Sequence, residues 1–220
     1  MKLVGKTAIV TGGGRDIGRA VAERLASEGA SVAINYFSSA KGADEAVAAI
    51  SAKGGRAIAV QGDLNEKADA DALVQAAVDA FGAVDILVNT AGGLIARRTV
   101  AEMPLEHWDA VMRLNLTSTF LMTQACLAHM KTGAIVHLAR QAGRDGGGPG
   151  AVAYATSKGA VMTMTRGLAK ELGPDIRVNA LCPGMIDTDF HNGHTPVAGR
   201  RCFEANAPLI RQGHVDDAAN

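Results

Sequence analysis

Aromatic residues are scarce in this chain of 220 residues: they make up 4% of the sequence, although hydrophobic residues make up 48%. The core must therefore consist mainly of Ala, Val, Ile and Leu side chains. Neither sign of charge is in excess, since 22 basic residues balance 22 acidic ones. This balance excludes the basic surface typical of nucleic-acid-binding proteins. The length allows one large domain or two small ones, and the absence of an internal repeat or linker predicts a single domain over residues 1–220.

Cysteines are few, and Cys126, Cys182 and Cys202 lack the spacing of metal ligands, so we expect free thiols in a reducing compartment. No apolar run approaches the roughly 18 residues of a membrane span. The N-terminal residues also lack the apolar region of a signal peptide. These absences predict a cytoplasmic protein with no membrane partner. His191 and His194 are three residues apart, but no further ligand accompanies them, so no metal site is expected.

Short apolar runs alternate with segments of helical periodicity. The predicted strands cover residues 7–11, 31–35, 57–61, 85–89, 134–139 and 176–181. The predicted helices cover residues 18–28, 41–53 and 67–81, a tract that is interrupted near Pro104 and continues through Met130, and residues 152–172. Residues 143–150 hold five glycines and one proline, which indicates a loop. After Pro183 the periodicity fades.

The predicted strands are continuously apolar, which is typical of parallel strands covered by helices on both faces. Right-handed crossovers then predict an α/β fold with one doubly wound, Rossmann-like sheet in the order 3-2-1-4-5-6. In such a sheet, ligands bind beyond the carboxyl ends of the strands, at the switch point between strands 1 and 4. The functional residues are expected at that edge.

The first strand ends in a glycine-rich turn that contains Gly12, Gly13, Gly14, Arg15 and Gly18. Glycines let the backbone approach a pyrophosphate, and the N-terminus of the following helix offers N–H groups to it. The turn follows a strand and opens a helix, which is the context that a dinucleotide site requires. A plain connection between strand and helix is the alternative.

The second strand ends at Asn35 without the acidic residue that holds the ribose 2′-hydroxyl of NAD. Arg15 in the glycine turn and Ser38 after the strand favour NADP instead, with both residues on its 2′-phosphate. The alternative is that Arg15 is a solvated surface charge. The expected cofactor is NADP in preference to NAD.

Tyr154 and Lys158 are four residues apart in a predicted helix, so they share one face. A nearby ammonium favours phenolate, which lowers the pKa of the phenol toward the range of a useful general acid. Such pairs also occur on solvated helix faces. The glycine turn elsewhere in the chain makes this pair a candidate proton donor and its tuning group.

The glycine turn, Asn115 and the Tyr154–Lys158 pair together resemble the short-chain dehydrogenase/reductase family, near its 3-oxoacyl-carrier-protein reductase and sugar-alcohol dehydrogenase members. The resemblance covers about residues 5–220. It implies cofactor contacts from the following residues: Gly12, Gly14, Arg15, Ile17, Gly18, Asn35, Ser38, Asp63, Leu64, Asn89, Ala91, Gly92, Tyr154, Lys158, Pro183, Gly184, Ile186 and Thr188.

The resemblance also implies hydride transfer between the nicotinamide and a small or acyl-linked carbonyl or alcohol. Tyr154 would exchange a proton with the substrate oxygen. Lys158 would lower the pKa of Tyr154 and hold the nicotinamide ribose, and Asn115 with a water would relay the proton. Asp16 departs from the pattern, because a glycine is usual there and a carboxylate near the pyrophosphate is unfavourable unless it points away.

Arg140 is a larger departure, because the family has a serine there whose hydroxyl bonds the substrate oxygen. No Ser or Thr occurs between residues 133 and 155. Losing one such donor typically costs about 10²–10³ in turnover. One reading is a cofactor-binding pseudoenzyme or interaction protein, and the other is a site in which Arg140 or Gln141 donates instead. His137 is expected to be a strand residue that is satisfied locally.

Residues 209–220 resemble the segment that opens the last helix of the family. That helix and a seventh strand are therefore expected to be missing, which leaves an exposed sheet edge and uncovered apolar surface. A marginally stable, non-functional remnant is the third possible reading. A homo-oligomer is expected to form through the helices near residues 113–130 and 152–172.

Overall fold

The computed structural model describes the backbone of residues 1–220 and all side chains except those of Asn192 and His194. The strands are β1 (Thr7–Thr11), β2 (Ser31–Tyr36), β3 (Arg56–Gln61), β4 (Ile86–Asn89), β5 (Gly133–Leu138) and β6 (Ile176–Leu181). The helices are α1 (Asp16–Ser27), α2 (Ala40–Ala52), α3 (Lys67–Phe81), α4 (Leu105–Met112), the π-helix η1 (Arg113–Thr117), α5 (Ser118–Leu127), α6 (Ala142–Asp145), α7 (Val152–Leu172), α8 (Asp189–His194), α9 (Val197–Asn206) and α10 (Val215–Ala219).

The strands form one parallel sheet in the order β3-β2-β1-β4-β5-β6, which confirms the predicted topology. β1 lies between β2 and β4, so the order reverses beside it. All five residues of β1 are buried. The turn after β1 therefore begins at the switch point of the sheet, where such folds bind ligands.

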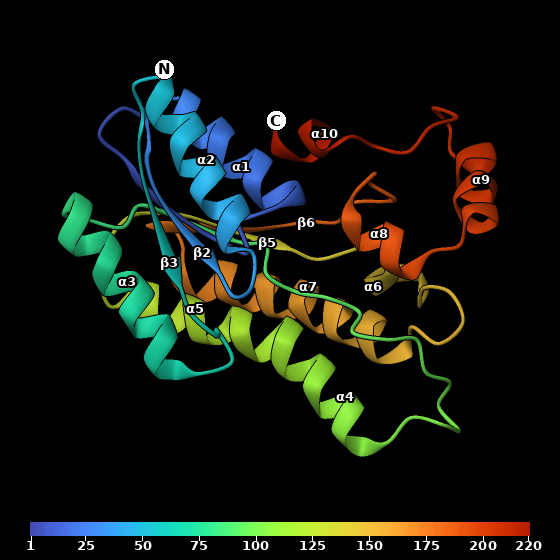
Figure 1. Ribbon diagram of the computed structural model, residues 1–220. Helices are drawn as coiled ribbons and strands as arrows, with labels where there is room; N and C mark the ends of the chain where they lie inside the picture. Colours follow the sequence, from blue (N-terminus) through green and yellow to red (C-terminus); the bar gives the residue numbers. More distant parts are fainter.

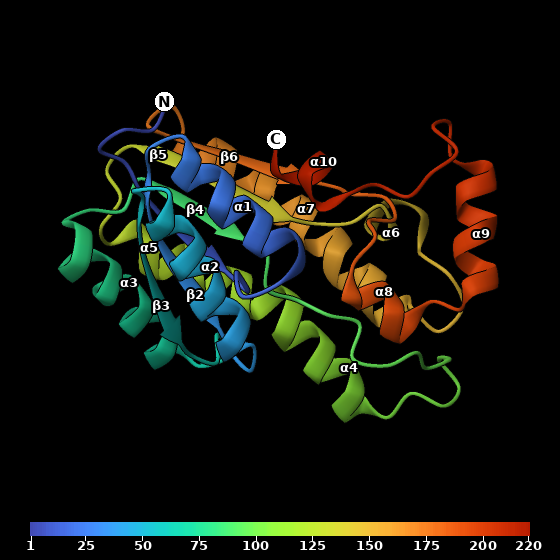
Figure 2. The ribbon, with the colours of Figure 1, turned by 45° about the horizontal axis from the view of Figure 1, so that its top comes forward.

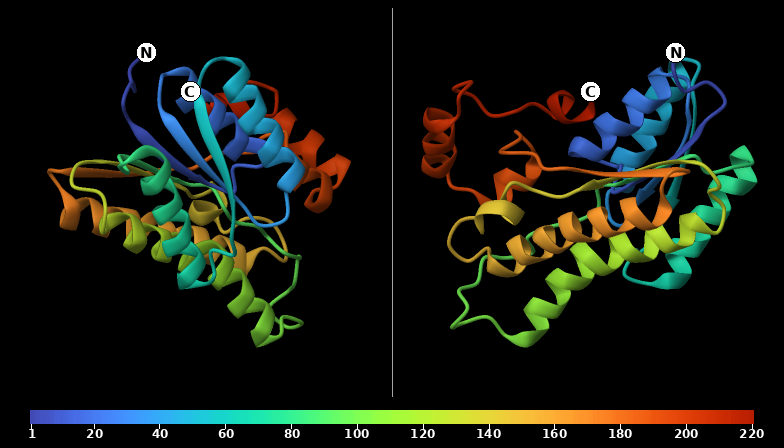
Figure 3. Two further views of the ribbon diagram at one scale, coloured as in Figure 1. Left: turned by 60° about the vertical axis from the view of Figure 1, so that its left-hand side comes forward. Right: turned by 180° about the vertical axis from the view of Figure 1, so that it is seen from behind.

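Helices cover both faces of the sheet (Figures 1 and 2). α1, α2 and α10 lie on one face, and α3, α5 and α7 lie on the other; the view from behind in Figure 3 has the same layers. Alternate residues of β1 enter separate cores: Val10 packs with Val21 of α1 and Ala46 of α2, whereas Ile9 packs with Leu73 of α3 and Met122 of α5. Small and aliphatic side chains thus fill the interior, as the scarcity of aromatic residues requires.

Two predictions of local structure were wrong. The helical tract after β4 begins only at Leu105, directly after Pro104, and residues 90–104 contain no helix. The loop at residues 143–150 includes the C-terminal part of the short helix α6. After Pro183, where periodicity predicts no element, the chain forms α8, α9 and α10, and neither α9 nor α10 contains a buried residue. α10 lies within residues 209–220, which resemble the segment that opens the last helix of the family.

β6 forms one edge of the sheet, as expected from the sequence. Its Ile176 and Val178 are buried in the core that α3, α5 and α7 share, whereas Arg177 and Asn179 are exposed. α10 packs against the α1 side of the molecule, where Val215 joins the core. The prediction of one domain over residues 1–220 is not tested by these contacts and stays a prediction.

Candidate active site

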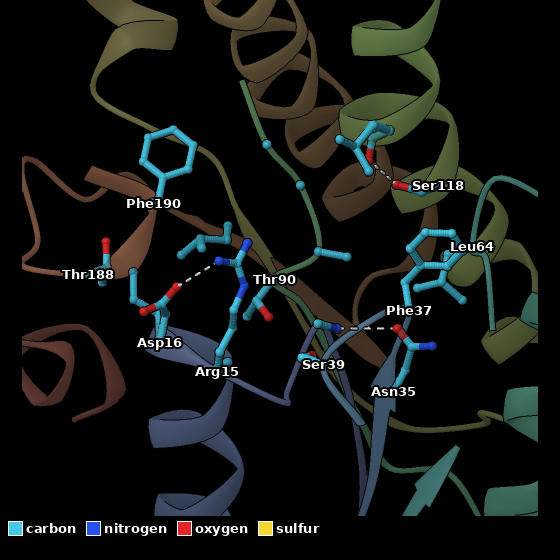
Figure 4. Close-up of a pocket in the computed structure, with 18 of the residues that line it drawn as sticks. Arg15, Asp16, Asn35, Phe37, Ser39, Leu64, Thr90, Ser118, Thr188 and Phe190 are labelled. Atoms are coloured by element: carbon cyan, nitrogen blue, oxygen red, sulfur yellow. Dashed lines mark hydrogen bonds and ion pairs between the residues drawn. The ribbon is translucent and has the colours of Figure 1, made fainter. Parts of the chain in front are cut away.

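A cavity of about 580 Å³ runs along the carboxyl ends of the strands, and the loops after all six of them contribute to its wall (Figure 4). Arg15, Asp16, Thr188 and Phe190 lie toward one side, with Asn35 on the other. The cavity brings together the following residues predicted from the sequence: Gly12, Arg15, Ile17, Gly18, Asn35, Ser38, Asp63, Leu64, Ala91, Gly92, Arg140, Tyr154, Lys158, Pro183, Ile186 and Thr188.

Four predicted site residues, Gly14, Asn89, Asn115 and Gly184, are not among the residues described as lining this cavity. Gly14 packs against the side chain of Ser39, directly before α2. A Cβ on Gly14 would collide with Ser39, so glycine allows α2 to lie close to the turn. Asn89 and Asn115 are buried and hydrogen-bonded to neighbouring protein groups. Gly184 lines an adjoining cavity instead.

Thr11 and Asn35 fix the loops at the strand ends through hydrogen bonds with the backbone. The Thr11 hydroxyl accepts from the N–H groups of Thr90 and Ala91, both at 3.0 Å. The Asn35 side-chain oxygen accepts from the N–H of Gly12 at 3.3 Å, and its amide nitrogen donates to the loop after β3 at 3.2 Å. Both side chains thus shape the cavity by holding its loops.

The N-terminus of α1 faces the cavity without a side-chain cap. Arg15 is the N-cap residue, and its side chain makes no capping hydrogen bond. The N–H groups of the first turn and the positive end of the helix dipole are therefore suited to an anion. Gly12 adopts φ of +60°, and a Cβ on Gly18 would collide with the Gly12 carbonyl, so both positions require glycine.

Asp16 has a left-handed backbone with φ of +51°, which explains why glycine suits this position. Its carboxylate accepts a hydrogen bond from the N–H of Asp189 at 3.1 Å and lies 3.7 Å from the Arg15 guanidinium. Figure 4 places the carboxylate between Arg15 and Thr188. Asp16 therefore ties the glycine turn to the start of α8, although its charge still borders the cavity.

The π-helix η1 carries Asn115, which is fully buried. Its amide nitrogen donates to the carbonyls of Gly93 and Val111 at 2.8 and 2.9 Å, and its oxygen accepts from the N–H of Gly93 at 3.0 Å. A Cβ on Gly92 would lie 2.6 Å from Asn115 Oδ1 and 3.1 Å from Lys158 Nζ. Asn115 and Lys158 thus converge on a close approach at Gly92, and π-helical turns often mark such functional sites.

Tyr154 and Lys158 lie on the buried face of α7, 8% and 3% exposed. Lys158 Nζ donates to the carbonyl of Leu138 at 2.8 Å and lies 5.8 Å from the centroid of the Tyr154 ring. Burial, reinforced by the charge of Arg140, lowers the pKa of Lys158 to about 8. Burial raises the pKa of Tyr154, and Arg140 opposes that shift. The cation that lowers the pKa of Tyr154 is therefore Arg140, whereas the sequence assigned this role to Lys158.

Arg140 follows β5 and lines the cavity together with Tyr154. Its Nη2 donates to Nε2 of His191 at 2.9 Å. Its Cζ lies 5.7 Å from the centroid of the Phe190 ring, which in turn lies 6.0 Å from the ring of Tyr154. Burial lowers the pKa of Arg140, against the opposing effects of Tyr154 and Asp145. A long cation thus occupies the position for which the family resemblance implies a serine hydroxyl.

His137 is fully buried in β5, and its Nδ1 lies 3.1 Å from the side-chain nitrogen of Asn89. Burial, with a smaller effect of Lys158, lowers its pKa to about 4, so the ring is neutral at pH 7. Its Nε2 has no hydrogen-bond partner in the described part of the chain. His137 is therefore a strand residue bonded to Asn89, and its low pKa does not suit a second acid.

The described residues contain no cluster of three or more His, Cys, Asp or Glu side chains that could hold a metal ion. The side chain of His194, which the sequence paired with His191, lies outside the described residues. None of the described helices combines the length and hydrophobicity that a membrane-spanning helix needs.

Comparison with known proteins identifies the family to which this site belongs. The sequence profile described as "short chain dehydrogenase" matches residues 6–196. The chain belongs to the short-chain dehydrogenase/reductase family. Members of this family are oxidoreductases that use a nicotinamide cofactor. The glycine turn, Tyr154 and Lys158 are therefore the residues to consider for cofactor binding and proton transfer.

Two curated relatives cover nearly all of this dehydrogenase. A protein named 3-oxoacyl-[acyl-carrier-protein] reductase from Synechocystis sp. is 42% identical over 99% of the chain and 87% of its own length. Glucose 1-dehydrogenase 2 from Bacillus subtilis is 40% identical over 99% of the chain and 86% of its own length. The two relatives are about equally similar to this chain in sequence, yet their names indicate different substrates.

Solved structures agree with this fold. A short-chain dehydrogenase from Burkholderia cenocepacia in complex with NADP is 37% identical, with a TM-score of 0.93 over 100% of this chain and 89% of its own. A blue fluorescent protein from a metagenomic library in complex with NADPH is 38% identical, with a TM-score of 0.91 over the same shares.

The cavity has features that suit a dinucleotide. The uncapped N-terminus of α1 and Arg15 offer hydrogen-bond donors and positive charge at one end. Tyr36 ends β2 and Phe37 follows it, so no acid stands where one would hold the ribose 2′-hydroxyl of NAD. Asp63 lies in the loop after β3, and its N–H donates to Asp69 at 2.7 Å.

Sequence reasoning missed several residues that line the cavity. Thr90 and Gly93 belong to segments that were recognised, so closer attention to the loop after β4 could have found them. Residues 185–208 were expected to border the substrate, with Phe190 as a residue that either contacts a ligand or packs. Phe190 and Asp189 line the cavity, although neither was given as a site residue. The missed residues are Asp16, Phe37, Ser39, Gly62, Asn65, Thr90, Gly93, Ile95, Leu114, Ser118, Leu138, Ala139, Asp189 and Phe190.

Proposed function

We propose that this chain is an NADP-dependent oxidoreductase that interconverts a carbonyl compound and an alcohol, with Tyr154 as the group that exchanges a proton with the substrate oxygen. One observation carries the proposal: buried Tyr154 and Lys158 line the same cavity as Arg15 and the uncapped N-terminus of α1. A cofactor site and a proton donor thus share one continuous space.

The cavity residues divide the work of binding. Gly12, Gly18 and the N-terminus of α1 would hold the pyrophosphate, and Arg15 with Ser38 would hold the 2′-phosphate. Asp63 and Leu64 would border the adenine. Further residues would hold the nicotinamide half: Ala91, Gly92, Lys158, Pro183, Ile186 and Thr188. The bound cofactor would supply or accept the hydride at the reacting carbon.

Tyr154 is suited to reduction at neutral pH. Because burial raises the pKa of its hydroxyl, Tyr154 carries its proton at pH 7 and can donate it to a carbonyl oxygen. Lys158 is positively charged below its pKa of about 8 and would bind ribose hydroxyls beside the phenol. Asn115 would keep the floor of the site in place through Gly93.

A second candidate function is that of a cofactor-binding pseudoenzyme or interaction protein, which Arg140 favours. Its partly buried guanidinium borders the cavity beside Tyr154, where the family's serine would donate to the substrate oxygen. The positive charge of Arg140 would repel the positively charged nicotinamide ring of the oxidised cofactor in the same cavity. Turnover would then be low although the cofactor binds.

Tyr154→Phe tests the first function. We expect that NADPH binding, followed by its fluorescence, stays unchanged, whereas NADPH oxidation with a panel of ketones and 3-oxo thioesters falls by about 10²–10⁴-fold. Tyr36→Phe is the matched control, because Tyr36 is the other tyrosine of the chain and ends β2. NADPH binding without turnover of any panel member by the wild type would favour the pseudoenzyme.

We also propose that the chain forms a homo-oligomer through the helices near residues 113–130 and 152–172. Exposed apolar side chains on these helices support this pairing: Phe120 of α5 is 48% exposed and Val152 of α7 is 44% exposed. The apparent mass in solution tests the pairing, because a monomer at micromolar concentration would contradict it.

A further inference from the structure

Arg140 is a partly buried cation, and no described carboxylate pairs with it at close range. Its side chain has one hydrogen-bond partner, Nε2 of His191. No described carboxylate lies within 4.0 Å of its guanidinium, although Asp145 acts on it from farther away. A charge that is partly removed from water in this way is stabilised when an opposite charge binds to it.

The guanidinium has hydrogen-bonding capacity to spare, since it carries five N–H groups and one is used. Arginine can only donate, so Nε2 of His191 is the acceptor and the ring proton resides on Nδ1. That Nδ1 lies 2.8 Å from the hydroxyl of Thr195. The chain Arg140–His191–Thr195 therefore orients the guanidinium from one side and leaves its other N–H groups for a ligand.

α8 is held in place at two points, which makes this orientation firm. His191 of α8 bonds Arg140, and the N–H of Asp189 at the start of α8 donates to Asp16 in the glycine turn. The ring of Phe190, between them in sequence, lies near both the Arg140 guanidinium and the Tyr154 ring. Contacts with α8 and Tyr154 thus hold Arg140 in a defined position at the edge of the site.

Arg140 stands where two cavities meet. Arg140, Tyr154 and Phe190 line both the cavity of about 580 Å³ and an adjoining one of about 480 Å³. Among its described lining residues, the adjoining cavity also includes Arg97 and Asp145. A ligand that enters from this side reaches Arg140 and Tyr154 together.

We propose that Arg140 binds the carboxylate of a short oxo acid or hydroxy acid whose reacting carbon lies at Tyr154. This inference rests on the proposed function and adds a substrate class to it. Arginine pairs with carboxylates through two parallel hydrogen bonds, which serine cannot form. The bound anion would also separate the charges of Arg140 and Lys158, which otherwise repel each other.

The test compares 3-hydroxybutanoate with its uncharged methyl ester as substrates for oxidation with NADP. The acid should have a kcat/KM at least about 10-fold above that of the ester, in line with charge-assisted hydrogen bonds of about 1.5–3 kcal/mol. Arg140→Gln should lower kcat/KM for the acid by about 10–100-fold without a matching loss for the ester.

Arg144→Gln is the matched control, because Arg144 is an exposed arginine four residues away on α6. It should preserve the preference for the acid. Arg140→Lys keeps the charge without the fork and should retain only part of the preference. An equal loss for acid and ester in Arg140→Gln would overturn the proposal, because it indicates a structural role.

Calorimetry of 3-hydroxybutanoate binding to the NADP-loaded protein separates this inference from the proposed function. If the ester is oxidised but the acid is neither preferred nor bound through Arg140, only the inference fails. If neither compound is oxidised, the proposed function fails for this class. Weaker binding of the acid to Arg140→Gln would then still support the carboxylate site, and equal binding would overturn it.

Discussion

The two halves of the cavity are built in different ways. The cofactor half lies at the ends of β1, β2 and β4, where Thr11 and Asn35 bond the backbone of neighbouring loops. The substrate half lies between the loop after β5 and the segment after β6, where side chains bond one another, as Arg140 does with His191. The shape of the cofactor half is therefore set by the loops at the strand ends, whereas the shape of the substrate half depends on a few particular side chains.

This difference teaches where variation in the fold can occur. The loops that the sheet holds by backbone hydrogen bonds tolerate few changes at Gly12, Gly13 and Gly18, since a Cβ there would lie 3.0 Å or less from a neighbouring atom. In the substrate half, where side chains contact one another, one pair of residues can be replaced by another pair without any movement of the strands. In this chain the wall of the substrate half contains Arg140 where the family resemblance implies a serine, and we propose that Arg140 changes the substrate preference while the sheet still holds the cofactor half.

Lys158 lies where the two halves of the cavity meet, and Lys158→Met should have the largest effect on turnover among the variants considered next. We expect turnover to fall by about 10²–10³-fold, because the variant loses a buried positive charge beside the reacting atoms. The control is Lys170→Met, which changes an exposed lysine on the same helix. A variant that keeps full turnover would contradict the role of Lys158 in both halves.

The same substitution should stabilise the protein without cofactor. The pKa of Lys158 is lowered from 10.5 to about 8, so between these values the unfolded chain binds more protons than the folded one. Wild-type stability should therefore rise with pH from about 8 to 10.5, by up to about 3 kcal/mol. Urea denaturation of Lys158→Met should lack this rise, and a parallel rise in both proteins would refute the assignment.

Arg15→Ala tests the cofactor half alone. We expect the affinity for NADP to fall by about 10–100-fold, because the 2′-phosphate loses a charged donor, and the affinity for NAD to stay the same. Arg24→Ala provides the control, since Arg24 lies on the same helix and pairs with Glu28 at the surface. Equal losses for both cofactors, or no loss, would show that Arg15 is a solvated charge.

Asp16→Asn should have the smallest effect and probes the contact between the halves. Asparagine tolerates the left-handed backbone, so the variant removes the charge and little else. We expect NADP affinity to rise by about 3–10-fold, because the repulsion between a carboxylate and the cofactor phosphates is lost. Fluorescence titration measures the change, and a weaker affinity would indicate that the Asp16–Asp189 contact dominates.

The sequence predicted the cofactor half well and the substrate half poorly, for physical reasons. The strand cores are buried on both faces, so their apolar runs are visible, and the glycine turn is a contiguous motif. The partners Arg140 and His191 are 51 residues apart, and Asp16 and Asp189 are 173 apart. No local pattern reveals such pairings, because they depend on where the chain after β6 folds back.

α9 illustrates the same limit for secondary structure. None of its residues is fully buried, so it lacks the apolar stripe that predicts a helix. The region before Pro104 shows the opposite error, since it was assigned to a helical tract, and the helix begins only after the proline. Tyr154 and Lys158 were found because i and i+4 positions share a face.

Arg140→Ser tests the contrast between the halves most directly, in one protein preparation and with two readings. We predict unchanged NADPH affinity by fluorescence titration, together with a gain of about 10²–10³-fold in turnover of an uncharged ketone, because the serine hydroxyl supplies a donor without a charge. Unchanged or lower turnover of the ketone, or a loss of NADPH affinity, would contradict an intact cofactor platform beside a substrate wall altered by Arg140.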